Sequence, residues 1–494
     1  MALPGGAAAE PRDATRLGAD AYVRRGFEYL ARPRPEDQAE ADRLFRKALK
    51  AGPDRADAHV GLARVSLYLY TLGLDESPAR LSSTLKESRL AVDLAPDDPA
   101  AAAALALSLA ADDRLGPALE ESRRAVSAGP ASPEAHVALC MVLRLRKDEK
   151  GALDACRRAA EIAPHDPRVL TALGEALREA GLYEQALEMF GQAIDLDHEA
   201  IVPQLGTAAT LLKEGNYPAA RDLYNVLLKK WDYGENRARL GAAALLVATQ
   251  DYQGALDLYG SVEVPEGTTM PALFILYAKG YCLKRLGRDA EAEYFLSGLL
   301  DRVPPDYDGP ARGRELLFNA YDDLIAYFRS KGRDRKVIKL LRSACERPLV
   351  PTRLARALAD ELEARKEASE SAAVLERAIL GADALEDDLE LAESTLKLVR
   401  LRTSNGARRL PDDSLAARAL ALASERLRPS APGAAHYRLA RALSLAQRRE
   451  QAVQSLVQAR AAGYLPADQM AGEPDFERLR EDPGFEALLK PQTP

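Results

Sequence analysis

The residues with the clearest capacity for chemistry gather in the stretch EAHVALCMVLRLRKDEKGALDACRRAAEIAPHDP, from Glu134 to Pro167. It holds two of the four cysteines and two of the five histidines of the chain. His136 and Cys140 are four residues apart, so a helix would place them one turn apart on one face. Cys156 and His165 follow. Because cysteine and histidine are common zinc ligands, the stretch raises the hypothesis of a zinc site, to be weighed against the organisation of the whole chain.

The composition indicates a well-folded, helical protein. The chain has 494 residues, of which 47% are hydrophobic and 29% charged, and aromatic residues make up 6%. Alanine, leucine, arginine and glutamate dominate, and these side chains lose little freedom in a helix. The net charge of −7 argues against a dedicated nucleic-acid binder, because such domains are usually basic.

The sequence shows no targeting or membrane-spanning segment. The first residues contain no apolar core of signal-peptide length, and the longest small apolar run, Pro99–Ala111, is too short to span a bilayer. The four cysteines, Cys140, Cys156, Cys282 and Cys345, form no spacing motif, which suits a reducing cytosol. We expect a cytoplasmic location, and an export signal trimmed from the sequence stays an open alternative.

An internal repeat organises the chain. Three sets of residues recur at a spacing of 34 residues in its N-terminal half. A fixed period of this length is the signature of an array of small supersecondary units. The residues in register are Ala118, Ala152, Ala186 and Ala220; Ala125, Ala159, Ala193 and Leu227; and Pro99, Pro133, Pro167 and Ile201.

Each repeat is expected to form two helices. The first helix starts after Asp-Pro or Ser-Pro, because proline suits the first helical turn. It breaks at Gly181, Gly215 or the polar pair Asp112–Asp113. The second helix carries apolar residues at helical spacing, as in Tyr183–Leu196, and stops at a proline or at the polar residue in its place.

The repeat from Pro167 to His198 resembles the tetratricopeptide repeat family. The resemblance implies an all-α fold, a right-handed superhelical solenoid of about twelve helix pairs with a C-terminal helical cap. It also implies that the chain binds another protein. The residues at the positions where that family places its small and large packing residues are Leu173, Gly174, Leu177, Gly181, Tyr183, Ala186, Phe190 and Ala193.

The resemblance extends over most of the chain. We expect a flexible N-terminus at 1–18, an N-terminal array at 19–270, a C-terminal array at 271–464, and a cap and tail at 465–494. Repeat arrays need a cap that covers the last apolar face. The long loops of the first two repeats also resemble the bacterial tetratricopeptide regions fused to serine/threonine kinases and adenylate cyclases, but the sequence has no kinase motif.

The repeat favours packing roles for the histidines and cysteines over the zinc hypothesis. His59, His136 and His436 share one position near the start of a first helix, and His165 and His198 fall in turns. We therefore interpret the two cysteines as small buried apolar residues and expect no metal site. The two cysteine positions are shared by Ala106, Cys140, Gly174 and Ala208, and by Ser122, Cys156, Phe190 and Tyr224.

Nothing in the sequence indicates an enzyme. Paired acids such as Asp97–Asp98, Asp322–Asp323 and Asp387–Asp388 fall near the starts of helices, where acids favour the positive end of the helix dipole. No glycine-rich phosphate loop is present. We expect no catalytic residue, no cofactor and no small-molecule substrate.

A basic segment runs from Arg329 to Arg356, with ten basic residues against two acids. The next repeat is acidic, so one interpretation is that neighbouring repeats neutralise each other across a solvated face. The other is a docking patch for an acidic partner or a membrane surface. Nucleic acid is not expected, because no aromatic residues interleave with the basic ones. The residues predicted to face outward, here called the basic patch, are Arg335, Lys336, Lys339 and Arg342.

The most probable working surface is the concave face, which the first helices line in such a solenoid. The stripe predicted to face it is unusually apolar, and becomes aromatic and basic further along, a composition typical of interfaces. The alternative is that tight curvature packs these residues against each other. The stripe begins with Val23, Val60 and Ala103; the residues predicted to bind a partner, here called the inner-face set, are Val137, Met141, Leu205, Ala209, Leu212, Phe274, Tyr277, Tyr281, Lys284 and Arg285.

The function predicted is a protein–protein interaction scaffold or adaptor. The alternative is a regulatory or assembly subunit of a larger signalling, secretion or enzyme complex. The lysine and asparagine clamp of the chaperone-binding tetratricopeptide class is not supported, because Val137, Met141, Thr171 and Glu175 stand at its positions. The expected partner is a peptide or helical segment of another protein, or a multi-subunit complex.

Overall fold

The computed structural model describes residues 12–489 except 33, 72–73, 76, 231–234, 266–267, 308–310, 383–386, 404–409, 412–413, 428–430 and 465–466. Most of the segment expected to be flexible, 1–11 of 1–18, lies outside the described residues, as does the end of the tail, 490–494. The first helix already begins at Arg12.

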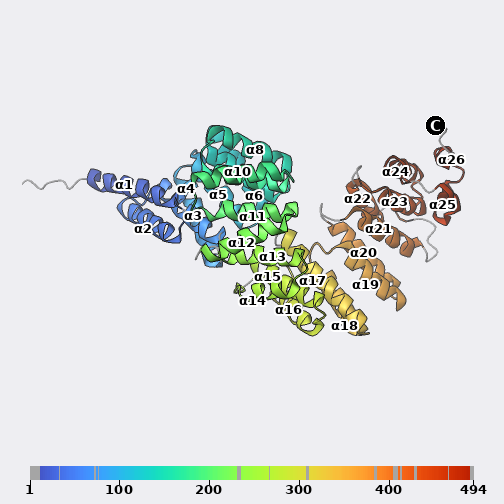
Figure 1. Cartoon of the computed structure of the whole chain (residues 1–494). Helices are drawn as coiled ribbons and strands as arrows, with labels where there is room; N and C mark the ends of the chain where they lie inside the picture. Colours follow the sequence, from blue (N-terminus) through green and yellow to red (C-terminus); the bar gives the residue numbers. More distant parts are fainter. Residues whose placement is uncertain are drawn as a thin grey trace, which may run out of the picture. The chain divides into compact units, whose positions relative to one another are not determined.

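The described residues are helical, and twelve pairs of helices follow one another along the chain (Figure 1). Within a pair the two helices pack together. This confirms the all-α repeat fold that the sequence predicts. The first six pairs are α1 (Arg12–Leu30) and α2 (Pro35–Ala51), α3 (Ala56–Thr71) and α4 (Pro78–Leu94), α5 (Pro99–Ala111) and α6 (Leu115–Ala128), α7 (Pro133–Leu145) and α8 (Glu149–Ile162), α9 (Pro167–Glu179) and α10 (Tyr183–Leu196), and α11 (Ile201–Glu214) and α12 (Tyr217–Lys230).

The second six pairs are followed by the C-terminal cap. The pairs are α13 (Glu235–Ala248) and α14 (Tyr252–Gly260), α15 (Met270–Arg285) and α16 (Asp289–Arg302), α17 (Ala311–Ser330) and α18 (Asp334–Cys345), α19 (Thr352–Ala364) and α20 (Ala368–Gly381), α21 (Asp388–Thr403) and α22 (Leu415–Arg426), and α23 (Gly433–Leu445) and α24 (Arg449–Ala461). The cap consists of α25 (Ala467–Gly472), the 3-10 helix η1 (Pro474–Leu479) and α26 (Pro483–Leu489).

The chain divides into two compact units, here called the N-terminal unit, up to Arg288, and the C-terminal unit, from Asp289. Each is described by itself. The division of the repeats into arrays at 19–270 and 271–464, with a cap from 465, stays a prediction.

The helix starts follow the predicted register. Four first helices begin at Pro99, Pro133, Pro167 and Ile201. The residue before each of the three prolines is Asp or Ser, and its side chain accepts a hydrogen bond from a backbone N–H of the first turn. Such a cap satisfies one of the donors that a helix start leaves free. Proline and cap together therefore fix where each first helix begins.

The turn inside each pair has one conformation that recurs with the repeat. A residue with positive φ follows the first helix at Asp113, Lys147, Gly181 and Gly215, again 34 residues apart. The next residue donates a backbone hydrogen bond to a carbonyl six positions earlier in numbering terms of the motif, as Leu182 does to Leu177 at 2.9 Å. This is the Schellman arrangement that closes many helix ends.

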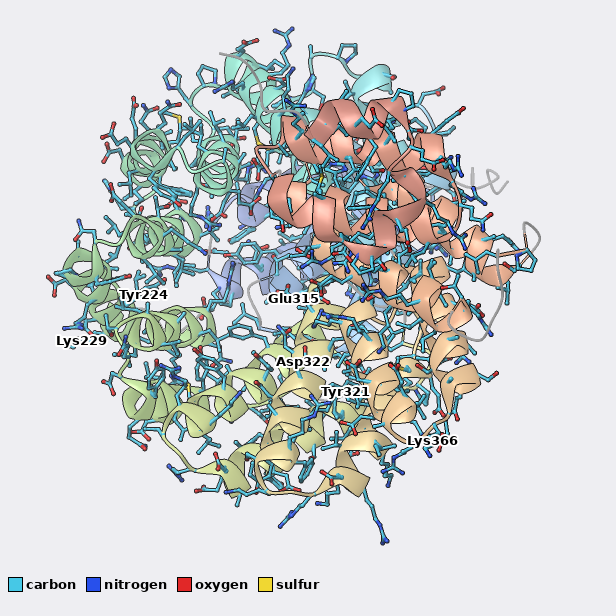
Figure 2. The ribbon with its side chains drawn as sticks, turned by 90° about the vertical axis from the view of Figure 1, so that its right-hand side faces the viewer. Tyr224, Lys229, Glu315, Tyr321, Asp322 and Lys366 are labelled. Carbon is cyan, nitrogen blue, oxygen red and sulfur yellow. A yellow bond between two sulfur atoms is a disulfide. The ribbon has the colours of Figure 1, made fainter. Side chains whose placement is uncertain are left out.

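The core of each pair is built from a small residue on the first helix and a larger one on the second. Phe190 of α10 is fully buried between Gly174 of α9 and Gly206 of α11. A Cβ atom added at Gly174 would lie 2.8 Å from the Phe190 ring, and one added at Gly206 would lie 2.6 Å from it. Tyr224, buried on α12 (Figure 2), has the same relation to Gly241 of α13. Glycine is therefore required for the close approach of the aromatic ring.

The cap covers the end of the array, as the sequence predicts. Phe476 of η1 and Phe485 of α26 are fully buried, and their ring centroids are 5.6 Å apart. The Phe476 ring also lies 5.6 Å from that of Tyr437 on α23. Asp475 accepts hydrogen bonds from Arg400 of α21 and Arg441 of α23, each at 2.8 Å. Apolar burial and paired charges thus both hold the cap on the last first helices.

Candidate functional site

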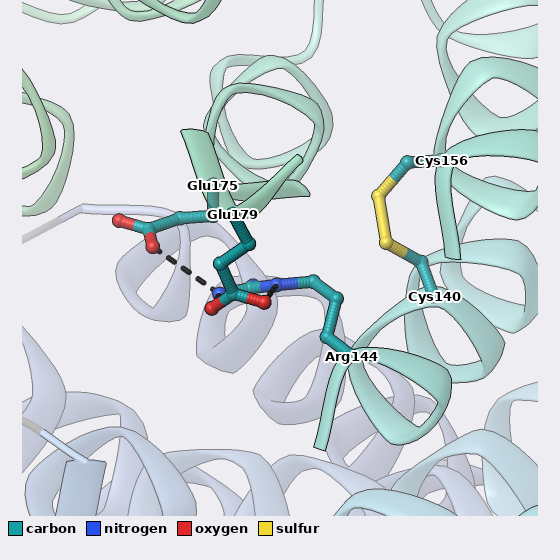
Figure 3. The surroundings of a disulfide bond; sticks show 5 residues. All are labelled: Cys140, Arg144, Cys156, Glu175 and Glu179. Carbon is teal, nitrogen blue, oxygen red and sulfur yellow. Dashed lines mark hydrogen bonds and ion pairs between the residues drawn. A yellow bond between two sulfur atoms is a disulfide. The ribbon is translucent and has the colours of Figure 1, made fainter. Parts of the chain in front are cut away.

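The stretch that raised the zinc hypothesis contains a disulfide bond. Cys140 of α7 and Cys156 of α8 are joined, and both are completely buried (Figure 3). The sequence interpretation of these residues as apolar thiols that fill space was therefore wrong. Sulfurs bonded to each other are not the thiolates that bind zinc. The bond also removes the cysteine argument for a reducing compartment.

The remaining cysteines and histidines are placed by packing. Cys282 and Cys345 are buried free thiols, and burial raises the pKa of Cys282 to about 11. His59 is bonded to Glu87 through Nδ1 at 2.6 Å, and His136 contacts the Pro130 carbonyl oxygen through Nε2 at 3.0 Å. In the part of the chain that the structure describes, no three His, Cys, Asp or Glu side chains gather as a metal site.

The beginning of the apolar stripe is closed by packing within the N-terminal unit. Val23, Val60 and Ala103 are 6%, 2% and 4% exposed. Val60 packs in one cluster with Ala101 and Ala104 of α5. Tight packing of neighbouring first helices, the alternative considered for the stripe, therefore applies to these three residues.

The inner-face set continues from that closed part, and its side chains differ in exposure. Leu205 is 8% exposed and belongs to the core cluster that also contains Ile201. Val137 and Leu212 are half-buried and pack against core clusters. Met141 and Ala209 are half-buried on α7 and α11. The half-buried members keep apolar surface on the first helices.

The aromatic part of the inner-face set is organised around tyrosines of the preceding pair. Tyr281 lies 6.3 Å from Tyr252 of α14, ring centroid to ring centroid, and 6.4 Å from Tyr277. The guanidinium of Arg285 lies 5.1 Å from the Tyr252 ring centroid. Phe274 lies 6.2 Å from Tyr259. Tyr277, Tyr281 and Phe274 are half-buried, and α15 therefore offers a partly exposed aromatic surface, next to the exposed Lys284.

The N-terminal unit also brings together helices that are distant in sequence. Tyr68 of α3 packs against the core cluster formed by α11, α12 and α13. Arg34, at the start of α2, is bonded to Glu199, which precedes α11. A period of 34 residues cannot reveal such contacts, because they depend on how strongly the array curves. The first two pairs thus lie against the sixth and seventh pairs.

The basic patch of the C-terminal unit is exposed and largely neutralised. Lys336 is paired with Glu293 of α16 at 3.1 Å, and Arg342 with Glu370 of α20 at 3.1 Å. Lys336 also lies 4.4 Å from the Phe328 ring centroid. These contacts agree with the interpretation that neighbouring repeats neutralise each other. Arg335 and Lys339 are exposed on the same helix, α18.

Ion pairs link successive first helices of the C-terminal unit. Asp322 of α17 (Figure 2) accepts a hydrogen bond from Arg353 of α19 at 2.9 Å. The pKa of the Asp322 carboxyl is nevertheless raised, chiefly by burial, and Asp323 and Glu390 add to this while Arg353 opposes it. The remaining links are Arg329 to Glu361, Lys397 to Glu363, Arg356 to Glu390 and Glu393, and Arg438 to Glu393. Charged pairs thus take the place that apolar contacts hold in the N-terminal unit.

Comparison with solved structures shows the kind of fold. Human IFIT1 as a dimer with m7Gppp-AAAA is similar over 57% of this chain and 72% of its own, at 16% identity and a TM-score of 0.45. A tetratricopeptide repeat protein from Parabacteroides merdae is similar over 53% of this chain and 98% of its own, at 16% identity and a TM-score of 0.39. TTC0263, such a protein from Thermus thermophilus, covers 39% of this chain and 99% of its own, at 20% identity and a TM-score of 0.33.

This chain has the fold of a tetratricopeptide repeat array. No family model matches the sequence, and no curated protein matches it. Within the described residues, every helix is too short or too polar to cross a membrane. Function must therefore be argued from the faces of the array itself.

Proposed function

We propose that the protein is an interaction scaffold whose N-terminal unit binds a segment of another protein on the inner-face set. The observation that carries this is the row of half-buried apolar and aromatic side chains on successive first helices, represented by Met141, Ala209 and Tyr277. Apolar and aromatic side chains that keep exposed surface are typical of interfaces. The polar first helices of the C-terminal unit, whose charges are already paired, support a different task for that unit.

Photo-crosslinking tests the proposal. Benzoylphenylalanine placed at Met141 or Ala209 should form crosslinks to one partner protein in the native host. The same residue at Tyr294, which is 74% exposed on the second helix α16, is the matched control. Crosslinks of equal yield to the same partner from Tyr294 would contradict a binding site on the inner-face set.

Substitution provides an independent test. Tyr281 stacks on Tyr252, so replacing it changes packing as well as the surface, and Met141→Ser and Tyr277→Ser are the sharper variants. Recovery of the partner should fall with each and fall further with both. Tyr294→Ser should leave recovery unchanged. Thermal melting shows whether each variant stays folded, and unchanged recovery with the folded double variant would refute the proposal.

A second candidate function is favoured by the disulfide. Disulfides persist mainly in oxidising compartments, and the buried Cys140–Cys156 bond fits an assembly or secretion subunit outside the reducing cytosol. Alkylation of thiols in intact cells of the native host tests this candidate. Protection of Cys140 and Cys156 supports it, and alkylation of both, after denaturation without reductant, contradicts it.

A further inference from the structure

Helix α3 carries a positive charge that the structure leaves without a bonded anion. Arg64 is half-buried, one helical turn after the buried Val60. In the described part of the chain, it has neither a hydrogen bond nor an ion pair. The neighbour that it does have is aromatic, because its Cζ lies 6.0 Å from the ring centroid of Phe27. Removing a guanidinium from water without a partner is unfavourable.

Other half-buried arginines on first helices show the usual arrangement. Arg144 of α7 donates hydrogen bonds to Glu179 at 2.7 Å and Glu175 at 3.2 Å, both on α9 (Figure 3). Arg441 of α23 is bonded to two carboxylates of the cap, those of Glu473 and Asp475. Each charge is thus neutralised by an acid of the following element. Arg64 departs from this arrangement.

The surroundings of Arg64 do not neutralise it. Burial lowers the pKa of Arg64 to about 10, and the charge of Arg168 acts in the same direction, whereas Glu134 and Asp166 oppose it. These three residues lie at the starts of α7 and α9, so both helices face Arg64. Both acids are engaged with Arg168, Asp166 at 2.8 Å and Glu134 at 3.8 Å. The positive charge of Arg64 is therefore left over.

We propose that Arg64 binds a carboxylate on an apolar segment of the partner protein, an assignment that rests on the proposed function. A guanidinium can hold a carboxylate through two parallel hydrogen bonds. The positions equivalent to Arg64 in the next two first helices are Leu107 and Met141, both apolar. A phosphate group with about two negative charges would be repelled more strongly by Glu134 and Asp166. A glutamate or aspartate flanked by leucine-like residues fits this chemistry.

Chemical labelling of arginine by phenylglyoxal, read residue by residue by mass spectrometry, tests the assignment on the whole chain. The probes are acetyl-Ser-Leu-Glu-Leu-Ser-amide, its glutamine counterpart, sodium acetate, inorganic phosphate and oligoadenylate. The glutamate peptide should slow the labelling of Arg64 by about fivefold or more at saturation. The glutamine peptide should not. Labelling of Arg123, which is exposed on α6, is the internal control and should not change.

Two results overturn the assignment. If neither the glutamate peptide nor acetate slows the labelling of Arg64, no carboxylate binds there. If phosphate or oligoadenylate protects Arg64 better than the glutamate peptide, the ligand is a phosphate and the carboxylate is excluded.

Partner recovery separates this inference from the proposed function. With Arg64→Gln and Met141→Ser, both variants should recover less partner than the wild-type chain. If Met141→Ser alone loses the partner, the proposed function stands and the Arg64 assignment falls. If both folded variants keep the partner, both proposals fall.

Discussion

Cys140 and Cys156 are bonded at two positions that, one repeat later, are occupied by Gly174 and Phe190. In both repeats the two residues are 16 positions apart, and in both they touch. The disulfide thus replaces the contact between a small residue and a large one that holds the neighbouring pair together. It is a covalent solution to the packing problem that every repeat must solve at this point.

Loss of the disulfide should lower the free energy of unfolding. In the chain-entropy model, closing a loop of about 15 residues contributes about 3 kcal/mol. Cys140→Ala/Cys156→Ala should therefore be destabilised by about that amount in urea unfolding. Cys140→Gly/Cys156→Phe, which copies the next repeat, should recover part of the loss. Equal stability of the wild-type chain with and without reductant would contradict the prediction.

The sequence predicted the fold from its period, and it contained a signal for the disulfide that column-by-column analysis overlooked. The column of Cys140 and the column of Cys156 were each assigned a packing role. The two columns contact each other, as Gly174 and Phe190 show, so two cysteines in one repeat can bond. The contact between Arg34 and Glu199 carried no such signal, because it depends on the curvature of the array and not on the period.

Gly174→Ala should destabilise the protein although alanine favours helix. The added Cβ would lie 2.8 Å from the ring of Phe190, which is fully buried and cannot move aside. Overpacking of this kind typically costs about 1–3 kcal/mol. Gly191→Ala on the neighbouring helix α10 is the control, because its Cβ would meet nothing within 4 Å. The control should gain about 0.5–1 kcal/mol from helix propensity, and urea unfolding of both variants measures the difference.

The turns inside the pairs offer a reciprocal pair of substitutions. Lys147 has a φ of 63°, and Gly181, one repeat later, has a φ of 74°. A side chain is unfavourable in this left-handed region. Lys147→Gly should therefore raise the free energy of unfolding by about 0.5–1 kcal/mol, and Gly181→Lys should lower it by a similar amount. Opposite signs in thermal or urea unfolding confirm the prediction, and a loss of stability in Lys147→Gly contradicts it.

Asp322→Asn should raise stability at neutral pH. Because the folded protein raises the pKa of the Asp322 carboxyl, mainly through burial, the folded state binds this proton more tightly than the unfolded state. Its contribution is therefore favourable at low pH and is lost as pH rises through the unfolded and then the folded pKa. Asparagine keeps an acceptor for Arg353 and has no charge to bury.

Urea midpoints at pH 7 and pH 4 check the Asp322 prediction. The advantage of the asparagine variant should be present at pH 7 and shrink at pH 4, where the carboxyl of the wild-type chain takes up its proton. A lower midpoint for Asp322→Asn at pH 7 would show that the ion pair with Arg353 outweighs the effect of burial. Asp360→Asn, on an exposed residue of α19, is a matched control for removal of one negative charge.

Arg64 and Arg144 should respond in opposite directions to the same substitution, methionine. Arg144 is held by Glu175 and Glu179, so Arg144→Met leaves two half-buried carboxylates without their partner and should lower the free energy of unfolding by about 1–3 kcal/mol. Arg64 has no bonded acid to lose, and methionine replaces a partly desolvated charge by an apolar side chain that packs on Phe27. Arg64→Met should therefore keep or raise stability, by up to about 1 kcal/mol, as substitutions at binding sites often do. A loss of stability in Arg64→Met equal to that in Arg144→Met would mean that Arg64 serves the fold and not a ligand.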